Sequence, residues 1–297
     1  MSVTIDQDVC TCCGACARVC VMHVIVQEEG SVPVINTTLP CLRCGHCYSV
    51  CPSSAIIPAY PNVLLPLVEE VVGIADKDEL SRHLKSNRSV RLFQKTPVSI
   101  DIIEELLEVC RFAASGENTR PVRWVVVNDP ARVQAFSAGC IEWLSSIPDD
   151  HPLKSFADAI LLLQSGQKDL ISRGAPAIII ACAQKQHVRE ETALISLIDC
   201  IIALTHLDIL SSSFGLGTCW DGFASIFVSM NPELAKPFDI PDELVFEYAM
   251  MIGYPDVSYV RIPPRDPAQI WVAGEGKLAK HGEDAPPVKP SSYRRMT

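Results

Sequence analysis

Residues 10–20 (CTCCGACARVC) and residues 41–51 (CLRCGHCYSVC) share one cysteine pattern. Each stretch reads C-x2-C-x2-C-x3-C. The first stretch begins at Cys10 and the second at Cys41, so each cysteine of the second lies 31 positions after its counterpart. The same interval separates Gly14 from Gly45, which follow the second cysteine of each stretch. The repetition indicates an internal duplication near the start of the chain.

The spacing of these cysteines predicts two [4Fe–4S] clusters. Three thiolates at i, i+3 and i+6 can surround three corners of one cluster, while the fourth cysteine points toward the other cluster. The expected ligand sets are therefore crossed: Cys10, Cys13, Cys16 and Cys51 for one cluster, and Cys41, Cys44, Cys47 and Cys20 for the other. Zinc is the alternative, but zinc sites usually use two separated C-x2-C pairs.

The segment 1–58 resembles a bacterial dicluster ferredoxin, with two differences. Cys12 is an additional cysteine inside the first loop, and we expect it to be a spectator rather than a ligand. Val21 stands where the second copy has Pro52, which leaves the exit of the first loop less rigid without removing a ligand.

Composition limits the remaining possibilities. The chain has 297 residues, 14 cysteines and a formal net charge of −10, which argues against nucleic acid as its main partner. No long uncharged apolar run predicts a membrane span, and the start of the chain does not read as a secretory signal. We therefore expect a cytoplasmic protein whose cysteines are not a disulfide framework.

The rest of the chain predicts a layered domain of helices and strands. Apolar spacing favours helices at 67–85, 102–114 and 192–214. Apolar or β-branched runs favour strands at 122–127, 175–182 and 245–253. Helices that alternate with strands are typical of α/β or α+β layers.

Four motifs over residues 85–273 resemble the FMN-dependent nitroreductase family. They are NRSVRLF (87–93), ASGEN (114–118), GLGTCWDG (215–222), and GYP (253–255) followed by Arg261 and PPR (263–265). Two departures are visible, because Asn87 stands where an arginine is common and Arg120 replaces a glutamine. No GxGxxG motif or P-loop is visible.

The resemblance implies an FMN site. Arginine forks suit a phosphate, so Arg88, Arg91 and Arg265 are expected to bind it, with Ser89 donating a hydroxyl and Arg261 as a further candidate. The expected contacts to the rest of the flavin come from Ser115, Asn118, Arg120 and the backbone around Asp221 and Gly222. Arg120 could equally form a surface salt bridge. We assign no catalytic acid or nucleophile.

The resulting fold class is α+β: a small ferredoxin-like domain and a three-layer α/β/α domain with a central mixed sheet. The expected divisions are a 2[4Fe–4S] domain at 1–60, a linker and helix at 61–84, an FMN domain at 85–273 and an extension at 274–297. The resemblance also implies a homodimer with flavin pockets at its interface, and we hypothesise that residues 275–297 wrap the second subunit.

Together these features predict an oxidoreductase with an internal electron path. An external low-potential donor would reduce the clusters, then FMN, then a small organic acceptor such as a nitroaromatic, quinone or enone. Two alternatives remain: an electron-transfer partner of another enzyme, or a redox sensor without a substrate of its own. The sequence does not determine the electron donor, the use of NAD(P)H, the acceptor or the redox potentials.

Overall fold

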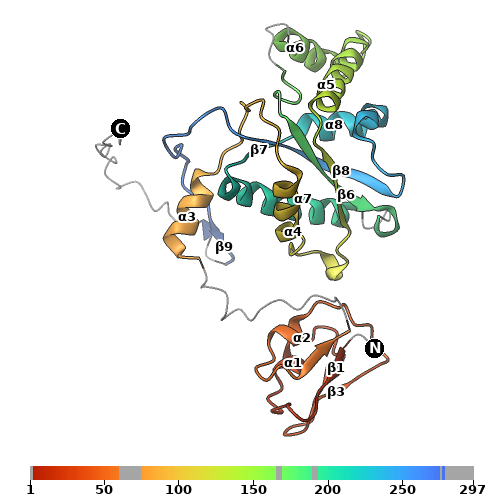
Figure 1. Ribbon diagram of the computed structural model, residues 1–297, viewed down its shortest axis with the longest axis vertical. Helices are drawn as coiled ribbons and strands as arrows, with labels where there is room; N and C mark the ends of the chain where they lie inside the picture. Colours follow the sequence, from red (N-terminus) through yellow and green to blue (C-terminus); the bar gives the residue numbers. More distant parts are fainter. Residues whose placement is uncertain (1–2, 60–74, 165–168, 189–192, 275, 278–297) are drawn as a thin grey trace, which may run out of the picture. The chain divides into compact units, whose positions relative to one another are not determined.

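The computed structural model describes residues 3–59, 75–164, 169–188, 193–274 and 276–277 (Figure 1). Its contacts divide the chain into two compact units, Met1–Ser258 and Tyr259–Thr297. The helices and strands of the first unit, in chain order, are β1 (Val3–Ile5), α1 (Ala15–Val19), β2 (Ile25–Val26), β3 (Val34–Ile35), α2 (His46–Ser49), β4 (Ile56–Pro58), α3 (Lys77–Ser86), α4 (Ile100–Cys110), β5 (Val122–Val127), α5 (Pro130–Ser145), α6 (Lys154–Gln164), β6 (Ala177–Gln184), α7 (Ala193–Ser211), β7 (Gly217–Trp220), α8 (Gly222–Met230) and β8 (Leu244–Gly253).

The N-terminal region, residues 3–58, is built from very short elements. β1 pairs with β4 and β2 pairs with β3, both antiparallel. Its buried core cluster consists of Val3, Cys16, Ile25 and Ile56. Partly buried cysteines of both repeats pack against these side chains. The core of this region is therefore small and made in part of thiols.

The larger domain is organised around a four-stranded sheet in the order β5-β6-β8-β7. All three pairings are antiparallel, so the expectation of a mixed sheet is wrong for the described residues. An apolar run predicts a buried strand but carries no information on the direction of its neighbours. Residues Ala177 to Ala183 of β6 are wholly buried, which requires cover on both faces of the sheet.

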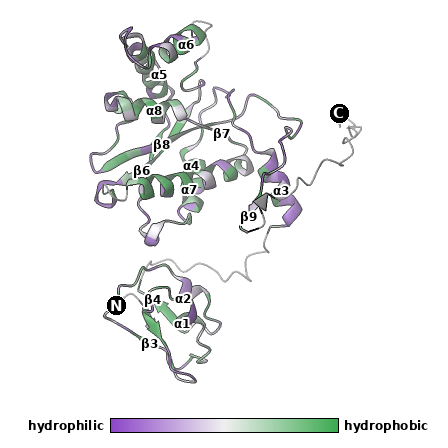
Figure 2. Cartoon of the chain, turned by 180° about the vertical axis from the view of Figure 1, so that it is seen from behind, coloured by the Kyte–Doolittle hydropathy of each residue, from purple (hydrophilic) through white to green (hydrophobic). Residues whose placement is uncertain are grey.

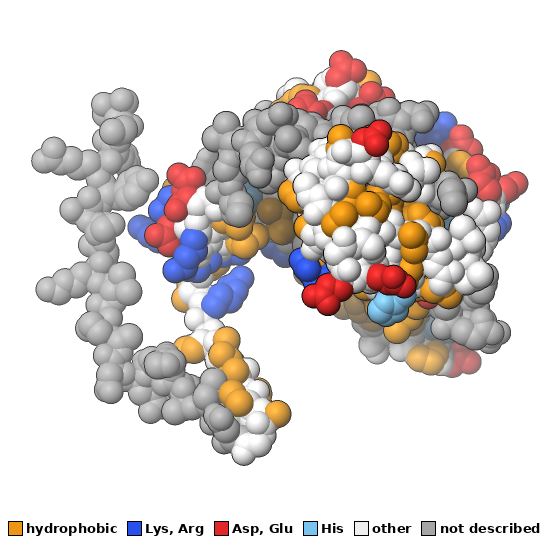
Figure 3. All heavy atoms as spheres, turned by 90° about the horizontal axis from the view of Figure 1, so that it is seen from below, with side chains coloured by type: hydrophobic (Ala, Val, Ile, Leu, Met, Phe, Trp, Pro, Cys, Tyr) orange, Lys and Arg blue, Asp and Glu red, His pale blue; other side chains and the backbone are white. Residues whose placement is uncertain are grey.

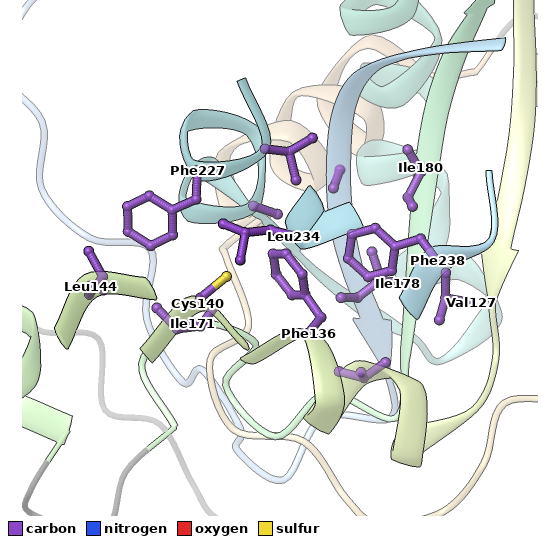
Figure 4. Close-up of a cluster of buried hydrophobic side chains, with 14 of the residues drawn as sticks. Val127, Phe136, Cys140, Leu144, Ile171, Ile178, Ile180, Phe227, Leu234 and Phe238 are labelled. Atoms are coloured by element: carbon purple, nitrogen blue, oxygen red, sulfur yellow. The ribbon is translucent and has the colours of Figure 1, made fainter. Parts of the chain in front are cut away.

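Helices provide that cover on both faces, which agrees with the predicted three layers. On one face, Ile103 and Leu106 of α4 and Leu204 of α7 pack against the sheet. On the other face, Phe136 of α5 and Phe227 of α8 form a second core, drawn in Figure 4. Figure 2 shows the same pattern, with hydrophobic colouring along β6, β8 and α7.

Helix α7, together with the 3-10 turn Ser212–Phe214, is long and apolar enough to cross a membrane by length and composition alone. In this fold it is a core helix, because Cys200, Leu204 and Leu207 are wholly buried against the sheet. Its composition is therefore weak support for a membrane span.

The predicted elements correspond closely to observed ones in most cases. β5 covers the predicted residues 122–127, and β6 and β8 begin within two positions of their predicted starts. Of the helix predicted at 67–85, the described part is α3, and residues 60–74 lie outside the described residues. Helices α5, α6 and α8 and strand β7 were not among the predicted elements.

The second unit contributes one small hairpin, β9 (Trp271–Val272) paired with β10 (Gly276–Lys277). Several of its large side chains are exposed, among them Val260 and Trp271. Exposed hydrophobic side chains are also visible on the surface in Figure 3. Residues 278–297 lie outside the described residues, so the predicted wrapping of a second subunit stays a prediction.

Candidate functional site

The eight repeat cysteines line two hollows in the N-terminal region. Four thiols line each hollow: Cys20, Cys41, Cys44 and Cys47 the first, and Cys10, Cys13, Cys16 and Cys51 the second. The fourth cysteine of each repeat thus lies with the first three of the other repeat. This grouping agrees with the crossed sets predicted from the spacing.

The backbone repeats along with the cysteines. Three pairs of residues at equivalent positions of the two copies have matching left-handed φ angles: Cys12 and Arg43 (54° and 53°), Gly14 and Gly45 (72° and 76°), and His23 and Ser54 (50° and 56°). Left-handed backbone is costly for residues other than glycine, so its recurrence at equivalent positions indicates a shared geometric requirement. Cys12 occupies the position of an arginine in the other copy and lines neither hollow.

Backbone amides point at the fourth thiol of each repeat. The N–H of Val24 donates to Cys20 Sγ at 3.3 Å, and the N–H of Ala55 donates to Cys51 Sγ at 3.2 Å. Val24 and Ala55 each stand four positions after their cysteine, so the two contacts are equivalent. An N–H directed at sulfur stabilises negative charge there, which favours thiolate ligands.

The thiols interact electrostatically within each set of four. Burial raises the pKa of Cys47 to about 11, and the neighbouring thiols Cys44, Cys41 and Cys20 add to the increase. Burial also raises the pKa of Cys16. Such thiols are protonated at neutral pH unless a metal takes the proton's place. Among the described residues, no group of three or more His, Cys, Asp or Glu is arranged to hold a single metal ion.

In the larger domain, the motif at 87–93 runs beside strand β7. The N–H of Val90 donates to the carbonyl oxygen of Thr218 at 2.7 Å. A methyl group at Gly217 would lie 2.3 Å from Val90 Cγ2, so the close approach requires glycine. The first and third motifs are therefore in direct contact.

The fourth motif joins the same place. Phe93 forms a bridge with Pro255, and the N–H of Gln94 donates to the carbonyl of Tyr254 at 2.8 Å. A Cβ at Gly253 would lie 2.9 Å from Phe93 and 2.6 Å from Pro176. Glycine at 253 thus permits three segments to meet at one edge of the sheet.

Asp208 of α7 fixes the residues around β7. Its carboxylate accepts hydrogen bonds from Asn87 Nδ2 at 3.0 Å, Trp220 Nε1 at 3.3 Å and Thr218 Oγ1. Asn87, which departs from the family pattern, is therefore a partner of α7. Trp220 makes an edge contact with Tyr248, with ring centroids 5.5 Å apart, so it is packed rather than free.

The arginines of the first motif differ in their surroundings. Arg88 donates to the carbonyl oxygens of Asn87 and Lys85, and its buried Nε has no partner among the described residues. Arg91 is exposed and forms no hydrogen bond or ion pair within the described part of the chain. Ser89 hydrogen-bonds the thiol of Cys219. Arg91, more than Arg88, is therefore available to an anion.

The second motif forms a strained loop anchored on α7. Glu117, Asn118 and Arg120 all have left-handed backbone, with φ of 50°, 55° and 47°. The N–H of Gly116 donates to Asp199 Oδ1 at 3.0 Å, while the buried Oδ2 has no partner among the residues described. Burial raises the pKa of Asp199. Left-handed backbone costs free energy and persists only where the surrounding structure holds it. Residues of this kind cluster at binding sites.

The side chains of this loop are largely engaged. Ser115 Oγ accepts the N–H of Arg120 at 2.9 Å. Asn118 Nδ2 donates to the carbonyl oxygens of Leu42 and Arg43 at 2.9 and 3.0 Å. Arg120 is exposed. In this conformation the Asn118 amide is thus bonded to backbone carbonyls, and a flavin contact would require it to exchange partners.

Asp221 is wholly buried and caps helix α8. Its Oδ1 accepts the N–H of Ala224 at 2.9 Å, and its own N–H donates to the carbonyl of Ala249 at 3.0 Å. Burial raises its pKa to about 7. Gly222, the first residue of α8, lies beside the hydroxyl of Tyr248, to which an added Cβ would be 3.6 Å away.

Arg261 and Arg265 belong to the second unit. Both are exposed, and Arg265 Nη1 donates to the carbonyl of Pro264 at 3.1 Å. Their role in phosphate binding stays a prediction, because they lie in a different compact unit from the other motifs.

Sequence reasoning did not single out Glu247 or Arg173. Glu247 is the extra residue of a bulge in β8, since Ala181 pairs with Tyr248 while Cys182 pairs with Phe246. Burial raises the pKa of Glu247 to about 7. Arg173 lies in the loop before β6 and carries a left-handed φ of 57°. Neither residue belongs to a motif, and Glu247 lies within electrostatic range of the buried thiols Cys182 and Cys200.

Comparison with known proteins identifies the larger domain. Residues 84–254 match the model of the nitroreductase family. A Methanothermobacter thermautotrophicus protein, provisionally named NADH dehydrogenase/NAD(P)H nitroreductase, is 24% identical over 183 residues, which are 62% of this chain and 81% of that protein.

A solved structure shows the same fold. A nitroreductase with bound FMN from Desulfitobacterium hafniense superposes with a TM-score of 0.51 at 19% identity, over 64% of this chain and 94% of that one. A nitroreductase with bound FMN from Bacteroides fragilis gives a TM-score of 0.49 at 16% identity, over 68% and 99% of the two chains.

Proposed function

Because this chain belongs to the nitroreductase family, we propose that it is an FMN-dependent oxidoreductase that receives its electrons through two [4Fe–4S] clusters. The observation that carries the electron input is the division of eight cysteines into two sets of four around separate hollows. Iron–sulfur clusters pass single electrons, whereas a flavin collects them singly and delivers two.

The residues of the N-terminal region fit the proposed clusters. Four cysteine thiols are the usual donor set of a [4Fe–4S] cluster. The amides of Val24 and Ala55 already point at the fourth sulfur of each repeat. Gly14 and Gly45 supply the left-handed turn after the second cysteine, which brings backbone close to each hollow.

The residues of the larger domain fit FMN. Three of the four motifs meet beside β7, where Arg91 has no partner among the described residues and Arg88 has an unpaired buried Nε. The structurally similar nitroreductase of Desulfitobacterium hafniense was solved with bound FMN, which supports the same cofactor here. When bound, FMN would supply hydride equivalents to a small organic acceptor.

A homodimer is part of the proposal. Asp199 holds the loop at 115–120, while Asp208 holds the segment at 87–93, and their positions on α7 are separated by about 13 Å of helix. Within one chain, the loop at 115–120 and the segment at 87–93 are therefore held at separate places along α7. Leu194, Ile195 and Ile198 of α7 are exposed, which suits a contact with a second copy.

The composition is tested by anaerobic purification in a cytoplasmic expression host. We expect about eight irons, eight sulfides and one FMN per chain. Zinc in place of iron would contradict the proposed clusters, and absence of flavin would contradict the proposed enzyme. Sedimentation of the same sample tests the homodimer.

The direction of electron flow is tested with one ligand variant. Cys44→Ser should abolish turnover driven by a reduced ferredoxin but spare reduction of the flavin by dithionite. Cys12→Ser is the matched control and should retain both. Normal ferredoxin-driven turnover in Cys44→Ser would show that electrons enter elsewhere, and a screen of nitroaromatics, quinones and enones that finds no acceptor would favour an electron carrier or a sensor.

A further inference from the structure

We propose that Arg173, a residue outside all four motifs, joins Ser89 and Arg91 in binding the phosphate of FMN. The inference deepens the proposed function and depends on FMN being the cofactor. It adds Arg173 to the arginines that the motifs predict for this role.

The backbone brings the loop of Arg173 next to the first motif. Phe93 packs against Ala175, Cys219 and Met251 in one small buried cluster. Pro176 and Phe93 both lie against Gly253, where a Cβ would approach them to 2.6 and 2.9 Å. Arg173 stands two positions before Ala175, as Arg91 stands two positions before Phe93. Both arginines therefore enter at the edge of the same cluster.

Cys219 belongs to this cluster and lies within electrostatic range of both arginines. Ser89 hydrogen-bonds its thiol, and the charges of Arg91 and Arg173 both act on it. Burial is the largest influence and raises the pKa of Cys219, which the two guanidiniums and Ser89 partly oppose. Two cations therefore lie within electrostatic range of one neutral thiol, to which Ser89 is hydrogen-bonded.

No carboxylate among the described residues forms a salt bridge with either arginine, and the Asp169 carboxylate in the loop of Arg173 is bonded to backbone N–H groups. Neither Arg91 nor Arg173 forms an ion pair or a hydrogen bond with the described part of the chain. Asp221 is within charge range of Arg173, but its carboxyl is wholly buried and bonded to the N–H of Ala224. Arg88, by contrast, already donates to two backbone carbonyls.

Arg173 is also held firmly in its loop. Asp169 accepts the N–H groups of Ile171, Ser172 and Gly174, each at 3.0 Å, on either side of it. Arg173 has a left-handed φ of 57°, and Gly174, which follows it, has a left-handed φ of 66°. A half-buried guanidinium on a fixed loop loses little freedom on binding an anion, and a phosphate with close to two negative charges suits a pair of forks.

The test compares FMN with riboflavin, which has the same ring system and lacks the phosphate. Flavin-depleted full-length protein is titrated with each flavin by fluorescence quenching, for the wild type, Arg173→Asn and Arg173→Lys. Asparagine tolerates the left-handed backbone at this position, and lysine retains the charge without the fork. Arg111→Asn, an exposed arginine paired with Glu108, is the control.

We expect Arg173→Asn to weaken FMN binding by roughly 10- to 100-fold, the range of a charged hydrogen bond, and to change riboflavin binding by less than about 2-fold. Arg173→Lys should lose less, and Arg111→Asn should lose nothing. Equal losses for both flavins, or unchanged FMN binding in both Arg173 variants, would overturn the inference alone. A wild-type protein that binds neither flavin would overturn the proposed function and the inference together.

Discussion

The N-terminal region and the sheet domain are stabilised in different ways. The sheet domain has two hydrophobic cores, with wholly buried side chains from both faces of a sheet. The N-terminal region has a core cluster of only a few side chains, strands of two or three residues, and helices of four and five. Domains this small generally need cross-links or metals in addition to a core. The cysteine-lined hollows are where such bonds would form.

The largest expected effect is the removal of iron from the purified protein. Because metal–thiolate bonds would supply much of the folding free energy of residues 3–58, we expect chelation to abolish amide protection in β1 and β4. Protection in β6 and α7 should remain. Hydrogen exchange read by mass spectrometry measures both regions in one sample. An N-terminal region that keeps its amide protection without iron would contradict the prediction that metal–thiolate bonds stabilise it.

The next largest effect concerns the sheet domain alone. Phe136 is wholly buried and packs on Phe238 with ring centroids 4.5 Å apart. Phe136→Ala should lower the free energy of unfolding of this domain by about 3–5 kcal/mol while the iron content stays unchanged. Phe112→Ala, which removes an exposed ring, is the control and should cost far less. Denaturant unfolding followed by tryptophan fluorescence, under anaerobic conditions, measures both.

An effect of comparable size should appear in the pH dependence of the free energy of unfolding of the sheet domain. Because burial raises the pKa of Asp221 to about 7, the folded chain binds this proton more tightly than the unfolded chain does. The free energy of unfolding should therefore fall as pH rises from about 4 to about 7. Asp221→Asn keeps the cap on α8 and cannot ionise, so it should reduce this slope, while the contribution of the similarly shifted Glu247 remains.

At pH 8 the Asp221→Asn protein should be more stable than the wild type by on the order of 4 kcal/mol. The matched control is Asp129→Asn, which alters the exposed cap of α5. The free energy of unfolding of Asp129→Asn should change with pH as it does in the wild type. Thermal unfolding across the pH range gives the comparison, and equal slopes in all three proteins would show that Asp221 does not titrate differently in the fold.

The smallest expected effect separates Cys12 from its neighbour. Cys13 lines a hollow with three other thiols, whereas Cys12 lines neither. Cys13→Ser should lose about four irons per chain, and Cys12→Ser should lose none. Iron analysis after anaerobic purification measures both, and loss of iron from Cys12→Ser would place this cysteine among the ligands.

The cysteine grouping could be predicted from the sequence because the repeated spacing leaves few arrangements. Three thiols on one loop can line a hollow while the fourth points to the other repeat, and the folded chain groups them in this way. The strand at 122–127 was equally predictable from its β-branched run. In both cases the pattern that indicates the structure lies within a short stretch of sequence.

Features that depend on distant contacts could not be predicted in this way. The antiparallel order of the sheet requires the path of the chain between β6 and β8. The hydrogen bonds of the Arg88 guanidinium to carbonyl oxygens of its own segment are not visible in the sequence, and its role in phosphate binding stays a prediction. Arg173 belongs to no motif, and only the packing of Ala175 against Phe93 brings it near the first motif.

The cysteine repeat has a consequence for the history of the N-terminal region. Each copy directs its fourth thiol into the hollow formed by the other copy, so neither copy alone surrounds a hollow with four thiols. An ancestral peptide with a single copy could have completed its ligand sets only by associating with an identical peptide. Gene duplication would then have joined two halves that already needed each other, and the matching left-handed residues retain the symmetry of that pair.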